Sequence, residues 1–272
     1  MRGFRFGVQG PATLSEPGWT DFVRRAEDHG YHVVSLADHF DGRPAPLVAL
    51  AYAAAVTERI HLGTAVLGVD FRNPTVLVQE LGTLEELSRE RLEVGLGAGW
   101  KAEDYEATGI PFDPPGTRLE RLAALVPAVR AALGPGVRIV LGGGGRRMLT
   151  LAAREADVVS IVAPNRAGRS DPLGPDGTRD AFAARVALVR SAAGERATFP
   201  ELHTRVFATE AQAAQRMGAG DAAASPMVML ATAGAMADKL LRLRDDLGLS
   251  YFTVSAAFLD DFAPVLERLD GR

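Results

Sequence analysis

The stretch that decides the fold runs from Ile60 to Gly99. It reads "IHLGTAVLG" (Ile60–Gly68), then "PTVLVQELGTLEELS" (Pro74–Ser88), then "RLEVGLGAG" (Arg91–Gly99). The first and last segments are short and apolar, as buried strands are, whereas the middle segment has the length and apolar spacing of a helix. The order strand, helix, strand predicts parallel strands joined by a crossover helix.

The same alternation extends over the whole chain. Further strands are predicted at Phe4–Val8, His32–Asp38, Val137–Leu141, Val158–Ala163, Leu202–Ala208 and Tyr251–Ala256. Helices are predicted at Trp19–His29, Pro46–Thr57, Arg118–Leu133, Arg146–Ala156, Arg179–Ala193 and Met236–Gly248, with a last one from about Asp261 to Leu269. Eight strand–helix pairs predict a single (β/α)8 TIM barrel domain over residues 1–272. A doubly wound open sheet is the alternative, although such sheets usually have fewer strands.

Composition narrows the function classes. The chain has 272 residues, of which 47% are hydrophobic, and a net charge of −4 that gives no indication of a nucleic acid or membrane partner. It contains no cysteine, which excludes a disulfide, a thiolate metal site and a cysteine nucleophile, and which fits a reducing cytoplasm. No apolar run is long enough to span a membrane, so we expect a cytoplasmic protein.

Active sites of such barrels lie at the C-terminal ends of the strands. The residues predicted there are Gln9, Asp38–Phe40, Ala65–Gly68, Gly97–Trp100, Gly142–Arg147, Val162–Ala163 and Ser255–Ala256. This set is poor in acids and bases, and of the five histidines only His39 is well placed, so no metal site is predicted. Many glycines with few catalytic groups suit a bound organic cofactor that carries the chemistry.

The segment "GGGGRR" comprises Gly142, Gly143, Gly144, Gly145, Arg146 and Arg147, between a predicted strand and a predicted helix. Successive backbone N–H groups, the positive end of the helix and two arginines together make a phosphate site. A flexible turn with two solvated arginines is the alternative.

Three further sets of residues are candidates with open alternatives. His39 donates a hydrogen bond or relays a proton, with Asp38 fixing its orientation, or else the pair is a cap and a satisfied loop histidine. Trp100, Glu103 and Tyr105 form one wall of a substrate pocket or a surface loop that packs on a helix. Arg72 binds an anionic group or pairs with a nearby acid.

The segments "SLADHF", "IHLGTAVLGVDFRNP", "RLEVGLGAGW" and "LGGGGRRMLTLAAREADVVSI" resemble the bacterial luciferase-like flavin and deazaflavin oxidoreductases, above all the actinobacterial branch that depends on coenzyme F420. The resemblance implies a TIM barrel whose mouth holds the cofactor ring. Asp38 and His39 then touch the ring, Ala65–Val66 form a strand bulge with a non-prolyl cis peptide behind it, and Gly142–Arg147 hold the cofactor phosphate. It places Trp100 and Glu103 near ring and substrate. By position, Gly68, Gly97 and Gly99 join the cofactor set, since glycines let a flat ring approach the backbone.

The chain departs from the pattern between the helix ending at Leu133 and the strand starting at Val137. Relatives have a long insertion there, so we expect a shortened one, with Pro164–Thr178 covering the site instead. Cationic residues for a sugar phosphate cannot be matched, so glucose 6-phosphate is not the expected substrate.

Three functions follow from the resemblance. The first is an F420-dependent oxidoreductase that transfers a hydride between the deazaflavin and a C=C, C=N or C=O of a small organic substrate. The alternatives are a monooxygenase that uses flavin mononucleotide (FMN) and a non-catalytic barrel. The family also implies a homodimer through the second and third helices, for which the small residues of Ala49–Val56 allow close packing, although a helix buried against the barrel explains them equally well.

Overall fold

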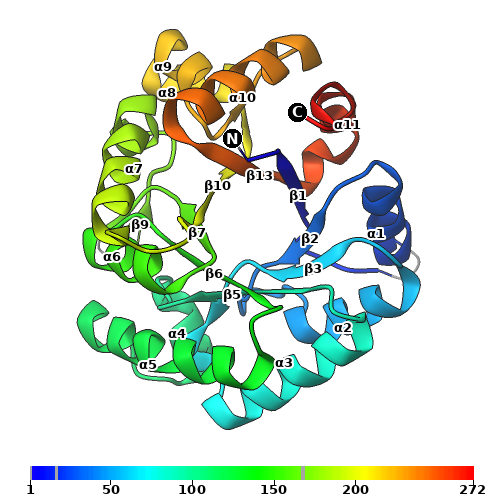
Figure 1. Ribbon diagram of the computed structural model, residues 1–272, viewed down its shortest axis with the longest axis vertical. Coiled ribbons are helices and arrows are strands. Elements are labelled where there is room, and N and C mark those ends of the chain that lie inside the picture. Colours follow the sequence, from blue (N-terminus) through cyan, green and yellow to red (C-terminus); the bar gives the residue numbers. More distant parts are fainter. Residues whose placement is uncertain (1, 16–17, 167–168) are drawn as a thin grey trace.

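Eight parallel strands close into a barrel in the computed structural model, which describes residues 2–15, 18–166 and 169–272 (Figure 1). In chain order they are β1 Arg5–Gln9, β2 Val33–Leu36, β3 His61–Thr64, β5 Leu92–Gly97, β6 Arg138–Gly143, β7 Val158–Ile161, β10 Glu201–Val206 and β13 Leu249–Ser255. Each strand pairs in parallel with its neighbours, and the β3–β5 and β1–β13 pairings complete the ring. The predicted TIM barrel is therefore confirmed, and the open sheet is excluded.

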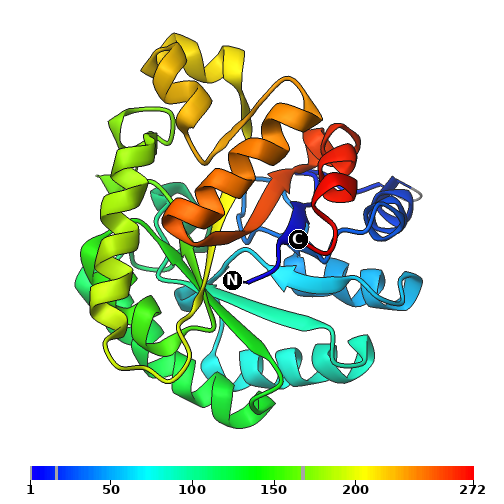
Figure 2. The ribbon, with the colours of Figure 1, turned by 45° about the horizontal axis from the view of Figure 1, so that its top comes forward.

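Within the described residues, eight helices cover the outside of the barrel (Figure 1, Figure 2). They are α1 Gly18–Asp28, α2 Pro46–Val56, α3 Pro74–Ser88, α5 Pro115–Leu133, α6 Arg146–Glu155, α7 Arg179–Ala193, α10 Ala233–Leu247 and α11 Leu259–Leu269. The start of α3 shows why the chain turns helical, because the Asn73 side chain caps it ahead of Pro74. Its buried residues Leu77, Leu81 and Leu84 recur at helical spacing and face the barrel.

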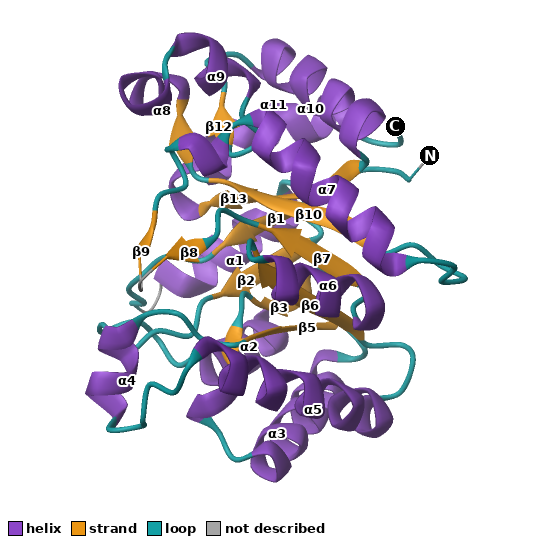
Figure 3. Ribbon diagram, turned by 90° about the vertical axis from the view of Figure 1, so that its left-hand side faces the viewer, coloured by secondary structure: helices purple, strands orange, loops and turns teal. Residues whose placement is uncertain are grey.

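Short elements that the sequence did not predict cluster at one end of the barrel. They are β4 Leu67–Gly68, α4 Ala102–Thr108, β8 Asn165–Arg166, β9 Arg169–Ser170, β11 Ala208–Thr209, α8 Glu210–Met217, α9 Ala219–Ala224 and β12 Val228–Met229. Figure 3 places α4, α8 and the β8–β9 hairpin at the end away from both termini. Residues 167–168 of the predicted cover, Pro164–Thr178, lie outside the described residues, so the cover stays a prediction.

The predicted short connection is present. Only Gly134–Val137 separate α5 from β6, so no inserted segment stands between them. None of the described helices combines the length and hydropathy of a membrane span. That residues 1–272 form one domain stays a prediction.

Polar side chains fill the interior of the barrel. Near the starts of the strands, Arg5 binds both Glu93 and Glu201 at 2.7 Å, and the three charges lie together in the interior. One step further along, the His203 ring is held between the hydroxyls of Ser160 and Thr253, each 2.8 Å away. Such groups are stable away from water only because each has a partner.

The pH dependence of stability tests whether His203 is buried in the barrel in its neutral form. Burial lowers the pKa of His203 to about 3, from 6.5. The unfolded chain therefore binds one more proton than the folded chain between pH 6.5 and 3, so the free energy of unfolding falls through this group by about 1.4 kcal/mol per pH unit as the pH drops. His203→Gln removes that dependence. We expect the stability gap between wild type and variant to narrow from pH 6.5 downward, as measured by urea unfolding at several pH values. A gap that stays constant with pH contradicts the buried neutral histidine.

Candidate active site

His39 follows β2 at the C-terminal mouth of the barrel, and Asp104 of α4 holds it. The Nδ1 atom of His39 lies 2.7 Å from Oδ2 of Asp104, while Oδ1 of Asp104 accepts the Phe40 backbone N–H at 3.0 Å. The Asp104 side chain is buried, whereas that of His39 is 20% exposed. No hydrogen bond occupies Nε2 of His39 within the described ranges. That nitrogen is therefore free to face a ligand.

The prediction that Asp38 orients His39 is wrong. Asp38 is buried and turned toward the third strand, where Arg72 donates to both of its oxygens at 2.6 and 2.9 Å and the Gly68 N–H donates at 3.0 Å. The Gly68 N–H and the Arg72 guanidinium are held in place by the neighbouring strand and loop. They bind this carboxylate better than the ring of the adjacent residue, His39, can. The same contact decides between the two roles expected for Arg72, because its guanidinium pairs with a nearby acid.

The bulge implied by the resemblance is present in the third strand. The peptide bond between Ala65 and Val66 is cis and separates β3 from β4. Val66 fits beside β5 because position 97 is glycine, where a Cβ would collide with the Val66 side chain. Asp38 at the end of β2 fastens the strand just after this bulge, through Gly68.

The structure gives different reasons for the glycines that were predicted to bind the cofactor. A Cβ at Gly68 would overlap the Phe71 ring, and Gly99 has a positive φ of 70° beside the Tyr105 hydroxyl. Gly144 allows the chain after β7 to pass close by, since a Cβ there would overlap Val162 and Pro164. Packing within the chain explains these three glycines.

Gly145 differs from them because a Cβ there would meet no atom within 4 Å. It is the N-cap of α6, and no side chain caps this helix start. The first backbone N–H groups of α6 therefore lack intrahelical partners and remain available to an anion. Arg146 and Arg147 are exposed, and the nearest acid to Arg147 is Glu120, 4.0 Å away. The structure thus gives the predicted phosphate site open space, free donors and positive charge.

Aromatic side chains surround His39. The Trp100 ring meets the His39 ring edge-on, with 5.9 Å between centroids, and Trp100, Phe40 and Phe112 are all exposed. Tyr105, by contrast, is buried and donates to Asp70 at 2.8 Å, so it does not belong to a substrate-facing wall. Trp100 and Phe40 thus offer exposed ring surface beside His39 on which an organic substrate can stack.

Glu103 lies exposed in the first turn of α4. No ion pair or hydrogen bond from its carboxylate appears in the part of the chain that the structure describes. It stays a candidate, on the same short helix as Asp104.

Sequence analysis missed Asp104 and Arg118. Arg118 is buried and holds the loop after β5 by donating from Nη1 to the carbonyls of Ala98 and Gly99. Asp104 stands next to the predicted Glu103, but the helix that turns it inward is only seven residues long. The segment Ala102–Thr108 has no apolar periodicity that would have indicated this helix.

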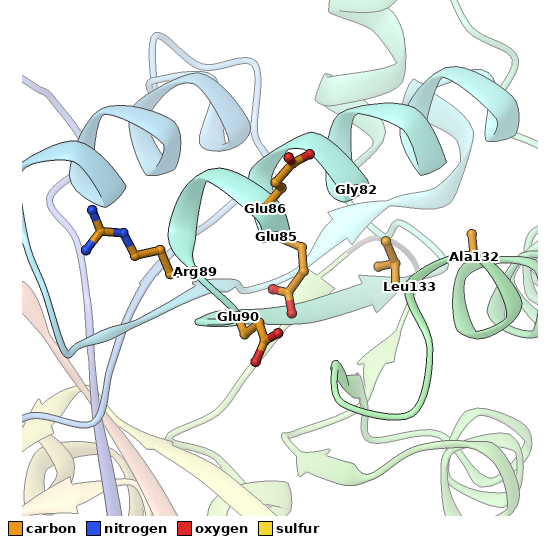
Figure 4. A pocket seen from close by; sticks show the side chains of 7 residues that line it. All are labelled: Gly82, Glu85, Glu86, Arg89, Glu90, Ala132 and Leu133. Atoms are coloured by element: carbon orange, nitrogen blue, oxygen red, sulfur yellow. The ribbon is translucent and has the colours of Figure 1, made fainter.

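A separate hollow of about 500 Å³ lies at the C-terminal ends of α3 and α5 (Figure 4). It is lined by Gly82, Glu85, Glu86, Arg89, Glu90, Ala132 and Leu133. The helices run opposite to the strands, so this hollow is at the other end of the barrel from His39 and Gly145. It is not part of the candidate site.

The Luciferase-like monooxygenase family matches residues 7–196, more than half of the chain. The chain belongs to this family. The match spans the strands that carry His39, Ala65–Val66 and Gly145, so these residues lie within the family's part of the barrel.

Several curated relatives are described as F420-dependent glucose-6-phosphate dehydrogenase, and two of them serve as examples. The one from Kineococcus radiotolerans is 40% identical over 135 residues, 46% of this chain and 39% of the relative. The one from Nocardia farcinica is 40% identical over 182 residues, 63% of this chain and 52% of the relative. The chain thus spans about half or less of the curated relatives it matches.

Among solved structures, the coenzyme F420-dependent tetrahydromethanopterin reductase from Methanopyrus kandleri is similar to the chain. It gives a TM-score of 0.74 at 15% identity and covers 98% of both chains. At that identity the likeness establishes the barrel fold.

The Asp38–Arg72 pair is testable through stability. Asp38→Asn removes the buried carboxylate and leaves the half-buried Arg72 without its charge partner, so we expect the free energy of unfolding to fall by about 3 kcal/mol. Asp41→Asn is the matched control, since Asp41 is exposed and its pairs with Arg43 and Lys101 lie near the surface; its effect stays within about 1 kcal/mol. Equal effects of the two variants in urea unfolding contradict the role given to Asp38.

Proposed function

We propose that the chain is a coenzyme F420-dependent oxidoreductase that transfers a hydride between the deazaflavin and a C=C, C=N or C=O of a small organic substrate. The observation that carries this is the match to F420-dependent relatives at 40% identity, which in the Nocardia farcinica protein extends over 182 residues. The geometry of the mouth supports it, because a single oriented imidazole and an open helix start are what a cofactor enzyme needs.

The residues present fit the cofactor. Its phosphate would lie at the start of α6, where Gly145 leaves room and the free N–H groups and Arg146 and Arg147 supply donors. Its ring would lie against the bulge at Ala65–Val66, within reach of His39. When bound, the deazaflavin supplies the two-electron chemistry.

In this proposal His39 handles the proton. Asp104 accepts from or pairs with Nδ1, which directs Nε2 into the mouth. His39 there stabilises the cofactor ring or delivers a proton to the substrate atom next to the hydride acceptor. The exposed rings of Trp100 and Phe40 exclude water and orient the substrate, and Glu103 is the second candidate for proton transfer.

A monooxygenase that uses FMN is the second candidate, and the family's own description favours it. The open phosphate site fits both cofactors equally well. The measured binding of F420 and of FMN therefore decides between the two functions.

We also propose a small-molecule substrate and a homodimer. Val48 and Tyr52 on α2 and Val76 on α3 expose apolar surface on adjacent helices, which supports pairing through them. The small residues Ala49, Ala53 and Ala54 are instead buried within the chain, so they do not contribute to that surface. The cytoplasmic location stays a prediction from the cysteine-free composition.

The test is a binding titration of the purified protein with oxidised and reduced F420 and FMN. We expect F420 to bind at least about tenfold more tightly, and to raise the melting temperature, because a ligand of the native state stabilises it. Preferential FMN binding with oxygen consumption assigns the chain to the monooxygenases. Failure of both cofactors to bind supports the non-catalytic barrel.

Matched variants locate the phosphate in the same titration. Arg146→Ala with Arg147→Ala is expected to weaken F420 about tenfold or more, since each arginine contributes a charge-assisted contact. Gly145→Ala is expected to weaken it without a clash in the native fold, because the added Cβ meets no atom of the chain within 4 Å. Arg154→Ala, at the opposite end of α6, is the control. Affinities unchanged in all variants favour the flexible-turn alternative.

A further inference from the structure

Arg205 is a charged side chain in the mouth that no role given so far uses. It lies near the end of β10, two residues after His203. His203 points into the barrel, where it contacts Ser160 and Thr253, and side chains alternate along a strand. Arg205 therefore also points into the barrel, one layer closer to the mouth.

Other arginines withdrawn from solvent have acceptors, whereas none is found for Arg205 among the residues that the structure describes. Arg72 binds Asp38, Arg91 donates to backbone carbonyls and the Thr57 hydroxyl, and Arg118 binds three carbonyls. The Nε of Arg205 is buried without a hydrogen-bond partner, and no ion pair joins its guanidinium to a residue in the described ranges. Arg205 is half-buried as a whole, but its Nε is withdrawn from solvent, and a buried donor without an acceptor is costly. The position is therefore suited to an incoming anion.

The surroundings of Arg205 add positive charge. Burial, and to a smaller extent the nearby charge of Arg43, lowers the pKa of Arg205 to about 10, so it remains protonated at neutral pH. Arg43 belongs to the loop after β2, at the same mouth. The Phe207 ring lies 5.9 Å from the guanidinium and supplies an apolar side to the position.

The strand order sets where Arg205 stands relative to the bulge. β10 is four strands from β3 in both directions around the ring, so Arg205 faces Ala65–Val66 across the mouth. A flat ring resting on the bulge would turn its other face toward β10. The side of the mouth near Arg205 would then be where a substrate binds.

On the proposed function, we infer that Arg205 binds a carboxylate of the substrate and so selects small carboxylate-bearing molecules. The guanidinium is a planar fork of N–H donors that matches a carboxylate with two parallel hydrogen bonds. The bound carboxylate supplies the acceptor that Nε lacks. Trp100 and Phe40 are then left to contact the apolar part of the same molecule.

The test uses benzoate and its neutral counterpart benzamide, titrated into the protein with and without F420. The readout is the NMR signal of the Arg205 Nε–H, assigned by its absence in Arg205→Lys. We expect benzoate to shift this signal and benzamide to leave it in place. Arg205→Lys and Arg205→Gln are expected to weaken benzoate about tenfold or more, the equivalent of one charge-assisted hydrogen bond, and to keep F420 affinity. Arg154→Lys is the control.

The outcomes separate this inference from the proposed function. Benzoate affinity unchanged in both Arg205 variants contradicts it, as does loss of F420 affinity in their place, which assigns Arg205 to the cofactor. Binding of phenyl phosphate in preference to benzoate contradicts the carboxylate class. If F420 does not bind wild type but benzoate still shifts Arg205 in the free protein, the proposed function fails and the anion site stands.

Discussion

The site depends on one buried interaction, the carboxylate of Asp38 held by Arg72 and by the Gly68 N–H. It ties the end of β2 to the strand just after the cis peptide at Ala65–Val66 and to the loop before α3. Because a buried charge needs a partner, these segments have one favourable arrangement. His39, the next residue, is thereby directed away from the third strand and toward α4.

Asp104 then completes the geometry that Asp38 starts. It binds both His39 and the Phe40 N–H, so one carboxylate fixes the ring and the loop that carries it. Two acids with separate tasks explain how a single histidine can be oriented at a mouth with few other ionisable groups. The outcome is a free Nε2 beside exposed aromatic rings.

The fold was predictable because its signals are local and repeated. Apolar strands such as Leu92–Gly97 and helices with buried residues at helical spacing follow each other eight times, and each signal is confirmed by a strand or helix. The short elements were missed, since α4 and the β11–β12 pair are stabilised by tertiary contacts rather than by their own periodicity. In the site, His39 and the Gly145 helix start were predictable from their places after strands. The partner of His39 was not, because Asp104 is distant in sequence and its direction depends on the packing of α4.

The glycines also show a limit of prediction from the sequence. A sequence rich in glycine at strand ends suggests space for a ligand, yet Gly68, Gly99 and Gly144 are required by neighbouring atoms of the chain itself. Only the geometry separates them from Gly145, which is open. The candidate phosphate position is thus narrowed from a run of four glycines to one helix start.

The central claim is that a cofactor phosphate lies at the start of α6 while its ring lies near His39. Hydrogen–deuterium exchange with and without saturating F420 tests it most directly. We expect F420 to slow exchange about tenfold or more at the N–H groups of Arg146–Met148 and in the loop after β2, because N–H groups that donate to the ligand are protected from solvent. Protection elsewhere, with both segments exchanging as in the free protein, would contradict it.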